Sequence, residues 1–267
     1  MNSKDQTTAD AFAHSWNNLP NGSVYTFDQF IDWFQPLTPN DFSGKRVLEL
    51  GCGGGSLLAH TLRCNPRELV GVDLGSSVET AQKNLARISQ KGWRIEKEDL
   101  TQYNEGNFDI VYCIGVLQHV KEPKKGFDAM LRNTKSGGVF HGWVYAREGN
   151  GIIVYIVDPI RKIASRLPWW FTKYALATPL VVPFFVYSKI LPVFPRFSFC
   201  KKLPLYEYAF WISARSFDFY RHVAFDQLVT PQTVYFPRCV IVGWLCASDI
   251  MAGSAYIFMS NGNSWKF

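Results

Sequence analysis

The sequence predicts an α/β fold with a doubly wound, mostly parallel sheet of seven strands and an inserted helical cap subdomain after the fifth strand. Three observations support this prediction. Apolar runs alternate with segments of helical periodicity over residues 45–145. A glycine cluster follows the first apolar run, and acidic residues follow the next two. About eighty residues then break the alternation before the chain returns to the sheet.

We expect four regions in the chain. These are an N-terminal lid or helix segment at residues 1–40, a core at 41–148, the helical insertion at 149–230, and a last helix with closing strands at 231–267. With 47% hydrophobic and 19% charged residues, the 267-residue chain can bury a sizeable core. The six cysteines form no C-x-x-C pair and have no histidine at metal-ligand spacing. This usage predicts no metal and is typical of reduced thiols in a cytoplasmic protein.

The first predicted strand and the turn after it indicate a nucleotide-type site. The run Val47–Leu50 predicts a buried strand, which ends in the glycine cluster 51–55 before a helix starts near Ser56. Glycines let a ligand approach the backbone, and the helix start supplies free N–H groups. A G-x-G-x-x-G dinucleotide motif would need glycine at position 56, whereas the spacing from Glu49 to Gly55 completes acid-x-G-x-G-x-G. An NAD-linked oxidoreductase is therefore disfavoured.

This spacing resembles the first motif of the class I S-adenosylmethionine (SAM)-dependent methyltransferases, (D/E)-x-G-x-G-x-G. The resemblance implies a Rossmann-like fold, SAM as cofactor and S-adenosylhomocysteine as product. It implies that Glu49 orients the loop or contacts the methionine end of SAM. It also implies that Gly51, Cys52, Gly53 and Gly55 pass under the cofactor.

The second predicted strand ends in an acid that suits a ribose. Residues 68–73 end at Asp73, roughly twenty residues beyond the glycines, where a carboxylate can accept hydrogen bonds from both ribose hydroxyls. We therefore expect Asp73 and its neighbour Leu74 at the cofactor.

The third predicted strand, residues 93–100, also has an acidic end. In the resembled family this end faces the adenine, which implies that Asp99 binds the exocyclic amine and that Leu100 packs on the ring. Glu98 is the alternative acid, because a shift of one residue exchanges the two faces of a strand.

The fourth predicted strand carries a further part of the resemblance. Residues 108–113 are an apolar run, as expected for a central parallel strand. The following Leu117-Gln118-His119-Val120 matches the family's L-x-H-V signature, and this placement implies that Cys113 and Ile114 lie at the cofactor. Five matched segments in the family's order extend to the fifth strand at Val139–Tyr145.

A capping box at Thr26–Gln29 predicts an amphipathic helix near the N-terminus. In the resembled family such a helix often closes over the SAM site, so Trp16 and Tyr25 are candidate lid contacts. The alternative is that these aromatic side chains only pack against the fold.

Three histidines are candidate general bases. His119 lies in the fourth-strand signature, His141 in the fifth strand, and His222 in an aromatic segment of the insertion. An imidazole can remove the proton of a hydroxyl acceptor near neutral pH, whereas a neutral amine needs no base. A structural role, tying the loop after the fourth strand to its neighbours, is the alternative for His119.

The insertion carries the excess positive charge of the chain. Residues 151–205 contain eight Lys or Arg residues and one acid, Asp158, interleaved with aromatic and aliphatic residues. The uncharged stretch between Lys173 and Lys189 is shorter than the ~20 residues of a membrane-spanning helix, and prolines interrupt it. The insertion is expected to be a cap over an apolar pocket, a surface that contacts anionic lipid, or a helical subdomain with its own core.

Polar residues on both sides of the insertion are candidate ligands of the methyl acceptor. Tyr145 and Arg147 leave the fifth strand at the carboxyl edge, where open α/β sheets bind ligands. Arg221, Asp226 and Tyr235 lie on the segment that returns to the sheet. Asp226 also fits a pair with the histidine four residues before it on a helix surface.

These features predict transfer of a methyl group, by direct in-line displacement, to an oxygen or nitrogen of a small acceptor that is apolar, anionic or lipid-linked. The (N/D/S)-P-P-(Y/F) motif of nucleobase amino-methyltransferases is absent, so nucleic acid is not an expected partner. Two alternatives stay open: an RNA-directed methyltransferase that uses the basic insertion, and a SAM-binding interaction module with weak catalysis. We expect a cytoplasmic protein, with peripheral contact with an anionic membrane and a homodimer as further hypotheses.

Overall fold

The computed structural model describes residues 6, 25–193, 203, 205–230, 232–251 and 253–267, and the chain forms two compact units. The first, called the sheet unit here, comprises Met1–Val144, Gly243–Tyr256 and Lys266–Phe267. The second, called the helical unit, comprises Tyr145–Val242 and Ile257–Trp265.

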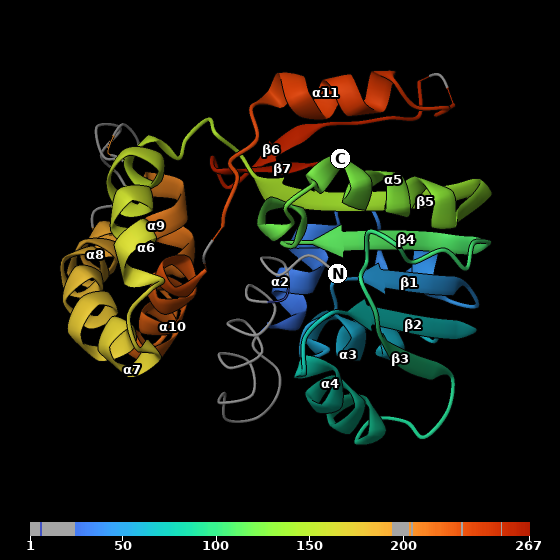
Figure 1. Ribbon diagram of the computed structural model, residues 1–267, viewed down its shortest axis with the longest axis horizontal. Helices are drawn as coiled ribbons and strands as arrows, with labels where there is room; N and C mark the ends of the chain where they lie inside the picture. The colour runs from blue at the N-terminus through green and yellow to red at the C-terminus, as the bar shows by residue number, and fades with distance from the viewer. Residues whose placement is uncertain (1–5, 7–24, 194–202, 204, 231, 252) are drawn as a thin grey trace. The chain divides into compact units, whose positions relative to one another are not determined.

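The sheet unit alternates strands and helices in chain order (Figure 1). Its elements up to the fifth strand are α2 (Phe27–Phe34), η1 (Pro39–Phe42), β1 (Arg46–Leu50), α3 (Ser56–Arg63), β2 (Glu68–Asp73), α4 (Ser77–Ala86), β3 (Trp93–Lys97), β4 (Phe108–Ile114), η2 (Leu117–His119), α5 (Pro123–Asn133) and β5 (Thr134–Tyr145). Two short strands follow near the end of the chain, β6 (Phe258–Ser260) and β7 (Ser264–Lys266).

The strands form one sheet in the order β3-β2-β1-β4-β5-β7-β6. Strands β1 to β5 pair in parallel, and β1 lies between β2 and β4. Gly142 and Phe267 exchange two backbone hydrogen bonds of 2.7 and 3.0 Å, the antiparallel pattern, so β7 runs against β5. The predicted seven-stranded, mostly parallel sheet is therefore confirmed. The strand order reverses beside β1, and ligands of such sheets bind outside the strand carboxyl ends at this switch point.

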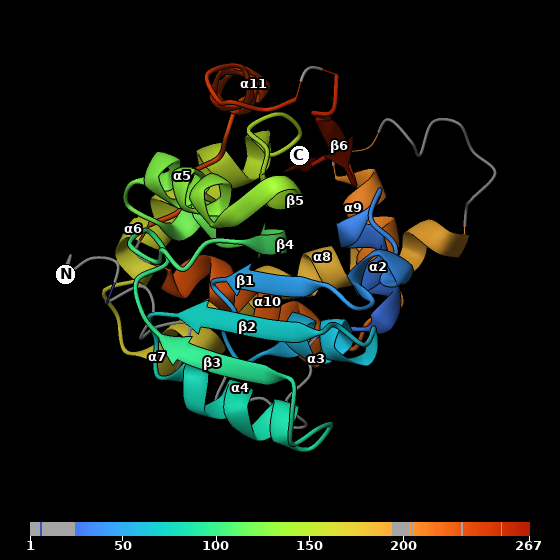
Figure 2. The same ribbon diagram turned by 90° about the vertical axis from the view of Figure 1, so that its right-hand side faces the viewer.

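Helices cover both faces of the sheet, which explains why its central strands are apolar throughout. On one face, Phe34 of α2 packs edge-on against Tyr112 of β4, with ring centroids 4.8 Å apart, and α3 and α4 lie on the same side (Figure 2). Val111, the next residue along β4, points to the opposite face. Its partner in β5 is Phe140, which contacts Phe127 of α5.

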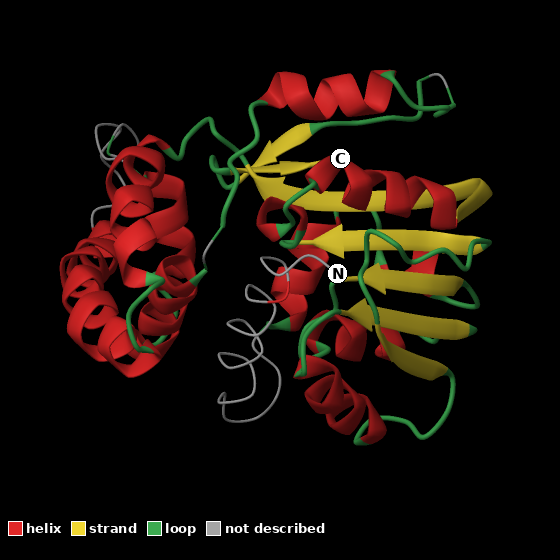
Figure 3. Cartoon of the chain, in the orientation of Figure 1, coloured by secondary structure: helices red, strands yellow, loops and turns green. Residues whose placement is uncertain are grey.

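The helical unit has two small cores of its own, and Figure 3 shows the described segments around them as helices joined by loops. Its helical elements are η3 (Ile153–Val157), α6 (Asp158–Ala164), α7 (Trp169–Phe171), η4 (Thr172–Ala177), α8 (Thr178–Ile190), η5 (Leu191–Val193), α9 (Tyr206–Ile212) and α10 (Phe217–Val229). Helix α11 (Arg238–Cys246) begins in this unit and ends in the sheet unit. One core gathers around Phe225 and the other around Tyr220, whose hydroxyl donates to the Ile212 carbonyl.

Element boundaries differ from the predictions at two places. Strand β3 ends at Lys97 rather than at residue 100, because the chain turns at Asp99. Strand β5 begins at Thr134 rather than at Val139, with a register shift between Phe108 and Ile110 of β4. Within the described ranges, no helix is both long and apolar enough to cross a bilayer.

Candidate active site

The turn between β1 and α3 requires glycine for two separate reasons. Gly51, Gly53 and Gly55 have φ values of +83°, +50° and +78°, in the left-handed region that favours glycine. A Cβ atom on Gly51 would also lie 2.6 Å from both γ-methyl groups of Val116, which follows β4. This glycine loop, residues 51–55, is therefore seated against the tip of β4. Helix α3 begins directly after it, so the first N–H groups of the helix adjoin the loop.

Glu49 is a buried carboxyl in the strand that leads into the glycine loop. Its Oε2 accepts a hydrogen bond of 3.1 Å from the hydroxyl of Tyr112, which lies 2.9 Å from Oγ1 of Thr61. Burial raises the pKa of the Glu49 carboxyl well above its ordinary value. A cation beside a carboxyl of this kind favours its ionised form. Glu49 is thus bonded into the core through Tyr112.

Asp73, at the end of β2, is bonded directly to the glycine loop. Its Oδ2 accepts from the backbone N–H of Gly53 at 2.8 Å. Its Oδ1 accepts from the N–H of Gly75 at 2.8 Å and from the hydroxyl of Ser77 at 3.2 Å. A carboxylate oxygen can accept more than one hydrogen bond, so Oδ2 keeps capacity for a ligand hydroxyl. Leu74 is half-buried beside it.

The two candidate acids after β3 have different surroundings. Asp99 is half-buried, and its Oδ1 accepts from both the N–H and the hydroxyl of Thr101, at 2.8 and 2.7 Å. The side chain of Glu98 is exposed, while its N–H donates to the carbonyl of Asp73. Leu100 is buried. Asp99 and Leu100 therefore follow a residue that is bonded to the end of β2, and Glu98 is exposed to solvent; the adenine assignment stays a prediction.

The carboxyl end of β4 forms an apolar wall. Cys113 and Ile114 are buried. Burial raises the pKa of the thiols of Cys113 and Cys52 well above their ordinary value, so both stay protonated near neutral pH and are poor nucleophiles. Leu117 and Leu100 share one neighbour, because a Cβ on Gly126 of α5 would contact both side chains. The segments that follow β3 and β4 thus meet at this glycine of α5.

Gln118 is a functional candidate that sequence reasoning missed. Its side chain is fully buried, and within the described part of the chain neither Nε2 nor Oε1 has a hydrogen-bond partner. A Cβ on Gly115 would lie 3.9 Å from Nε2 and 3.6 Å from the ring of Trp143, which places the amide at the β4 tip. Buried amides without partners are uncommon and cost about 1–3 kcal/mol. The available signal was a polar residue between Leu117 and His119, in an otherwise apolar turn.

The three candidate bases lie in different environments. His141 is fully buried in β5, with Nε2 2.8 Å from the carbonyl of Trp33 and Nδ1 against the hydroxyl of Tyr256. Burial lowers its pKa to about 4, so it is a neutral ring that links the sheet to α2. His222 is buried in α10 of the helical unit. His119 ends η2, is half-buried, and follows Gln118 at the β4 tip. Of the three histidines, only His119 lies at the carboxyl ends of the strands, where the residues predicted to bind SAM also lie.

Of the two N-terminal lid candidates, the structure describes Tyr25. Tyr25 lies just before α2, and its ring packs edge-on against Trp33 with centroids 4.6 Å apart. Its carbonyl oxygen is 2.9 Å from Nε2 of His60. These contacts fit the packing alternative. Trp16 lies outside the described residues.

Two acceptor-site candidates belong to one cluster in the helical unit. The rings of Tyr145 and Tyr235 stack with centroids 5.7 Å apart, and Nε2 of Gln227 donates to the Tyr145 hydroxyl at 3.0 Å. Arg161, 1% exposed, donates to the Tyr235 hydroxyl at 3.0 Å and to Asp158 at 2.8 Å. Burial raises the pKa of Tyr235. We call these five residues the Arg161 cluster; sequence reasoning did not foresee its central arginine.

The remaining acceptor-site candidates are placed elsewhere in the helical unit. Arg147 is exposed, and its N–H donates to the carbonyl of Phe236 at 3.0 Å. Arg221 pairs with Asp218 at 2.6 Å. Asp226 belongs to α10, and its side chain lies outside the described part of the structure. The predicted donor residues therefore meet at the ends of β1 to β4 in the sheet unit, whereas the acceptor candidates belong to the helical unit.

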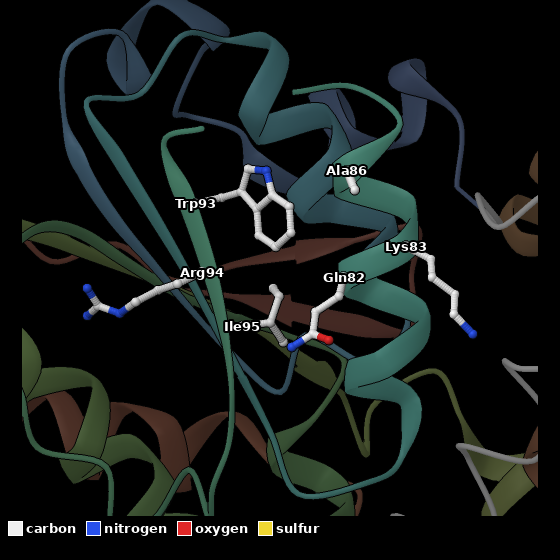
Figure 4. Close-up of a pocket in the computed structure, with 6 residues that line it drawn as sticks. All are labelled: Gln82, Lys83, Ala86, Trp93, Arg94 and Ile95. Carbon is white, nitrogen blue, oxygen red and sulfur yellow. The ribbon is translucent and has the colours of Figure 1, made fainter. Parts of the chain in front are cut away.

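An open hollow of about 500 Å³ lies elsewhere in the sheet unit, between α4 and β3 (Figure 4). It is lined by Gln82, Lys83, Ala86, Trp93, Arg94 and Ile95. Trp93 and Ile95 point toward α4, and Arg94 points away from it (Figure 4). Because Trp93 starts β3, the hollow is at the amino end of the strand, away from the glycine loop.

Comparisons with known proteins bear on the sheet unit. Residues 48–140 match the family described as "Methyltransferase domain". The chain is similar to a ubiquinone biosynthesis O-methyltransferase of Dechloromonas aromatica, with 33% identity over 148 residues, 52% of this chain and 62% of that protein. It is also similar to the protein of the same name from Acinetobacter baylyi, with 32% identity over 102 residues, 36% of this chain and 42% of that protein. The chain thus spans less than two thirds of the length of these relatives.

A solved SAM-dependent methyltransferase from Clostridium acetobutylicum is similar to 53% of this chain and 58% of its own, with 21% identity and a TM-score of 0.43.

Proposed function

We propose that this chain, whose residues 48–140 match a methyltransferase domain, transfers a methyl group from SAM to an oxygen or nitrogen of a small acceptor. The observation that carries the proposal is the bond between the Asp73 carboxylate and the N–H of Gly53. It joins the acid expected at the ribose to the loop expected under the methionine half, so one contact orders both ends of the donor site.

The residues at this edge fit SAM in charge and shape. SAM supplies a methyl group on a cationic sulfur that leaves without further activation. The glycine loop offers a backbone surface without side chains, and Asp73 retains acceptor capacity for a hydroxyl. The desolvated carboxyl of Glu49 favours a cationic neighbour. Asp99 accepts its two bonds from Thr101 through Oδ1, so its Oδ2 is the atom we assign to an exocyclic amine.

On the acceptor side, we infer that the enzyme works chiefly by positioning and desolvation. Cys113, Ile114 and Leu117 provide buried apolar contacts, which exclude water and suit an apolar acceptor. The amide of Gln118 offers a donor and an acceptor to orient a polar group. Good alignment of two reactants can account for about 7–11 kcal/mol of a barrier, so a strong base is not required.

We infer that a hydroxyl is the first acceptor class to test, because the two relatives described above are named O-methyltransferases. For a hydroxyl, His119 is the candidate that takes the proton, as it lies at the same strand end as the donor residues. An anionic or lipid-linked acceptor remains part of the proposal, supported by the basic and aromatic composition of residues 151–205.

Calorimetric titration of the purified chain with SAM tests the donor half. We expect binding, a loss of at least about tenfold in affinity for Asp73→Asn and for Asp99→Asn, and little change for Glu98→Gln, the exposed matched control. Absence of heat or melting shift at millimolar SAM would refute the proposal. A loss for Glu98→Gln equal to that for Asp99→Asn would overturn the adenine assignment alone.

A second assay tests the transfer step. The protein is incubated with SAM and panels of phenols, aliphatic alcohols and amines, and formation of S-adenosylhomocysteine is measured. We expect turnover with a hydroxyl panel, and a lower kcat with a steeper pH dependence for His119→Ala. Turnover with amines alone would contradict the proposal that the acceptor is a hydroxyl. SAM binding without turnover on any panel would favour a non-catalytic binding module.

A further inference from the structure

One helix of the helical unit exposes large apolar side chains. In the continuous stretch formed by η3 and α6, the exposed side chains recur every three or four residues, which places them on one helical face. Tyr155, Ile156 and Ile163 on this face are 73%, 58% and 68% exposed. On the inward face Arg161 and Ala164 are each 1% exposed, and Val157 and Ile160 pack against one of the two cores. An ordinary amphipathic surface helix carries polar residues on its exposed face.

The apolar exposure continues into the next two helices. Trp169, Trp170 and Phe171 of α7 are 44%, 55% and 37% exposed. Along α8, half-exposed aliphatic side chains recur four residues apart at Val182, Val186 and Ile190. Fourteen of the nineteen exposed large hydrophobic side chains in the described residues fall between positions 152 and 210. Exposure on this scale marks an interaction surface rather than scattered surface residues.

The charges on these helices are almost all positive. Lys162 and Arg166 are exposed on the apolar face of α6 and the turn after it, and Lys189 is exposed near the end of α8. The one acid of α6 to α8, Asp158, pairs with the buried Arg161 at 2.8 Å and lies 3.5 Å from Nζ of Lys162. An anionic partner therefore meets basic side chains without facing an unpaired acid.

We propose that this surface binds an anionic membrane from one side. We call it the interfacial face and define it by Tyr155, Ile156, Lys162, Ile163, Arg166, Trp169 and Trp170. Tryptophan and tyrosine favour the boundary between headgroups and acyl chains, aliphatic residues insert below it, and Lys and Arg bind anionic headgroups.

Charge complementarity favours a lipid surface over a second copy of this chain, because two such basic faces repel each other. The inference goes beyond the proposed methyl transfer and does not require SAM binding. It accounts for aromatic and basic groups that neither the donor site nor the Arg161 cluster uses. For an enzyme held there, acceptors dissolved in the bilayer would be the accessible class.

Vesicle flotation with the full chain tests the proposal, using neutral phosphatidylcholine vesicles and vesicles with 30 mol% phosphatidylglycerol. We expect retention on the anionic vesicles, weaker retention on neutral ones, and a decrease as salt is raised. Each basic residue contributes roughly fivefold to partitioning, so Lys162→Gln with Arg166→Gln should weaken binding about 25-fold. Tyr155→Ser with Ile163→Ser should also weaken it at least about tenfold.

A matched control carries the same loss of charge on the other unit. Lys83 and Arg87 are exposed, four residues apart, in and directly after α4, and Lys83→Gln with Arg87→Gln should leave retention unchanged. Circular dichroism and SAM titration of every variant separate loss of lipid binding from misfolding. No retention on anionic vesicles at low salt, or equal loss in the control, would overturn the proposal. A dimer that Tyr155→Ser with Ile163→Ser dissociates, without vesicle binding, would assign the face to a second copy instead.

Discussion

Replacing Gly51 by alanine tests why the glycine loop needs glycine. The φ of +83° is left-handed, and a residue with a Cβ pays about 1–2 kcal/mol to adopt it. The added Cβ would lie 2.6 Å from both γ-methyl groups of Val116, and crowding of this kind typically costs a further 1–3 kcal/mol or so. Gly51→Ala should therefore lower the free energy of unfolding by roughly 2–5 kcal/mol.

The chain contains a matched control that separates the two contributions. Gly92, just before β3, has the same φ of +83°, but nothing lies within 4 Å of the position its Cβ would take. Gly92→Ala should therefore show only the backbone contribution of about 1–2 kcal/mol. Adding Val116→Ala to Gly51→Ala removes the crowding but not the strain, and the coupling between the two substitutions measures the crowding directly.

Urea unfolding gives the free energies, and calorimetric titration gives the dissociation constant for SAM. Because the Gly51 Cβ would push the loop away from β4 and disturb the contact between Gly53 and Asp73, Gly51→Ala should weaken SAM binding at least about tenfold. Gly92→Ala should leave it unchanged. Equal losses of stability and affinity in the two variants would show that Val116 does not limit the loop, and the reasoning would be wrong.

Three further outcomes follow from buried polar groups. The free energy of unfolding should fall by up to about 3 kcal/mol as the pH drops from 6.5 to 4, because the pKa of the buried His141 is lowered to about 4 and the ring stays neutral while the unfolded chain binds a proton. Urea titrations of His141→Asn should not show this dependence of stability on pH. Arg161→Met should lower the free energy of unfolding by about 2–4 kcal/mol, since it removes a donor to Asp158, to both Gln227 oxygens and to the Tyr235 hydroxyl; a loss below about 1 kcal/mol by calorimetry would contradict this. Gln118→Leu keeps the volume but removes an amide without described partners, so thermal unfolding should show unchanged or higher stability. Binding of SAM or of the acceptor should be weaker in this variant. A loss of stability would show that the amide is already paired.

The fold class and the methyltransferase domain were predictable because their signals are local. Apolar runs flanked by turns marked β1, β2 and β4, and the acid-glycine spacing marked the loop. The capping box at Thr26 also reappears, with the Gln29 side chain accepting from the Thr26 N–H at 2.9 Å. In each case the residues that decide the structure are a few positions apart.

Features that depend on distant contacts were not visible in the sequence. The partners of His141 are Trp33, 108 positions away, and Tyr256, 115 positions away. The sequence alone therefore did not distinguish a structural role of His141 from the role of a catalytic base. The central role of Arg161 depends in the same way on Gln227 and Tyr235. The end of β3 was misplaced because the turn is made by the Asp99 side chain, which competes with the strand for backbone hydrogen bonds.

The path of the chain makes its two halves separable by protein engineering. The residues proposed to bind SAM, from Glu49 to Ile114, belong to one uninterrupted stretch, and the helical unit enters afterwards as Tyr145–Val242 before the backbone rejoins the sheet unit at Gly243. A chimera that exchanges only this later segment would leave the nucleoside-recognition machinery intact. Exchange of this segment can thus change the methyl acceptor, or the place in the cell where the protein acts, while the proposed SAM site is kept.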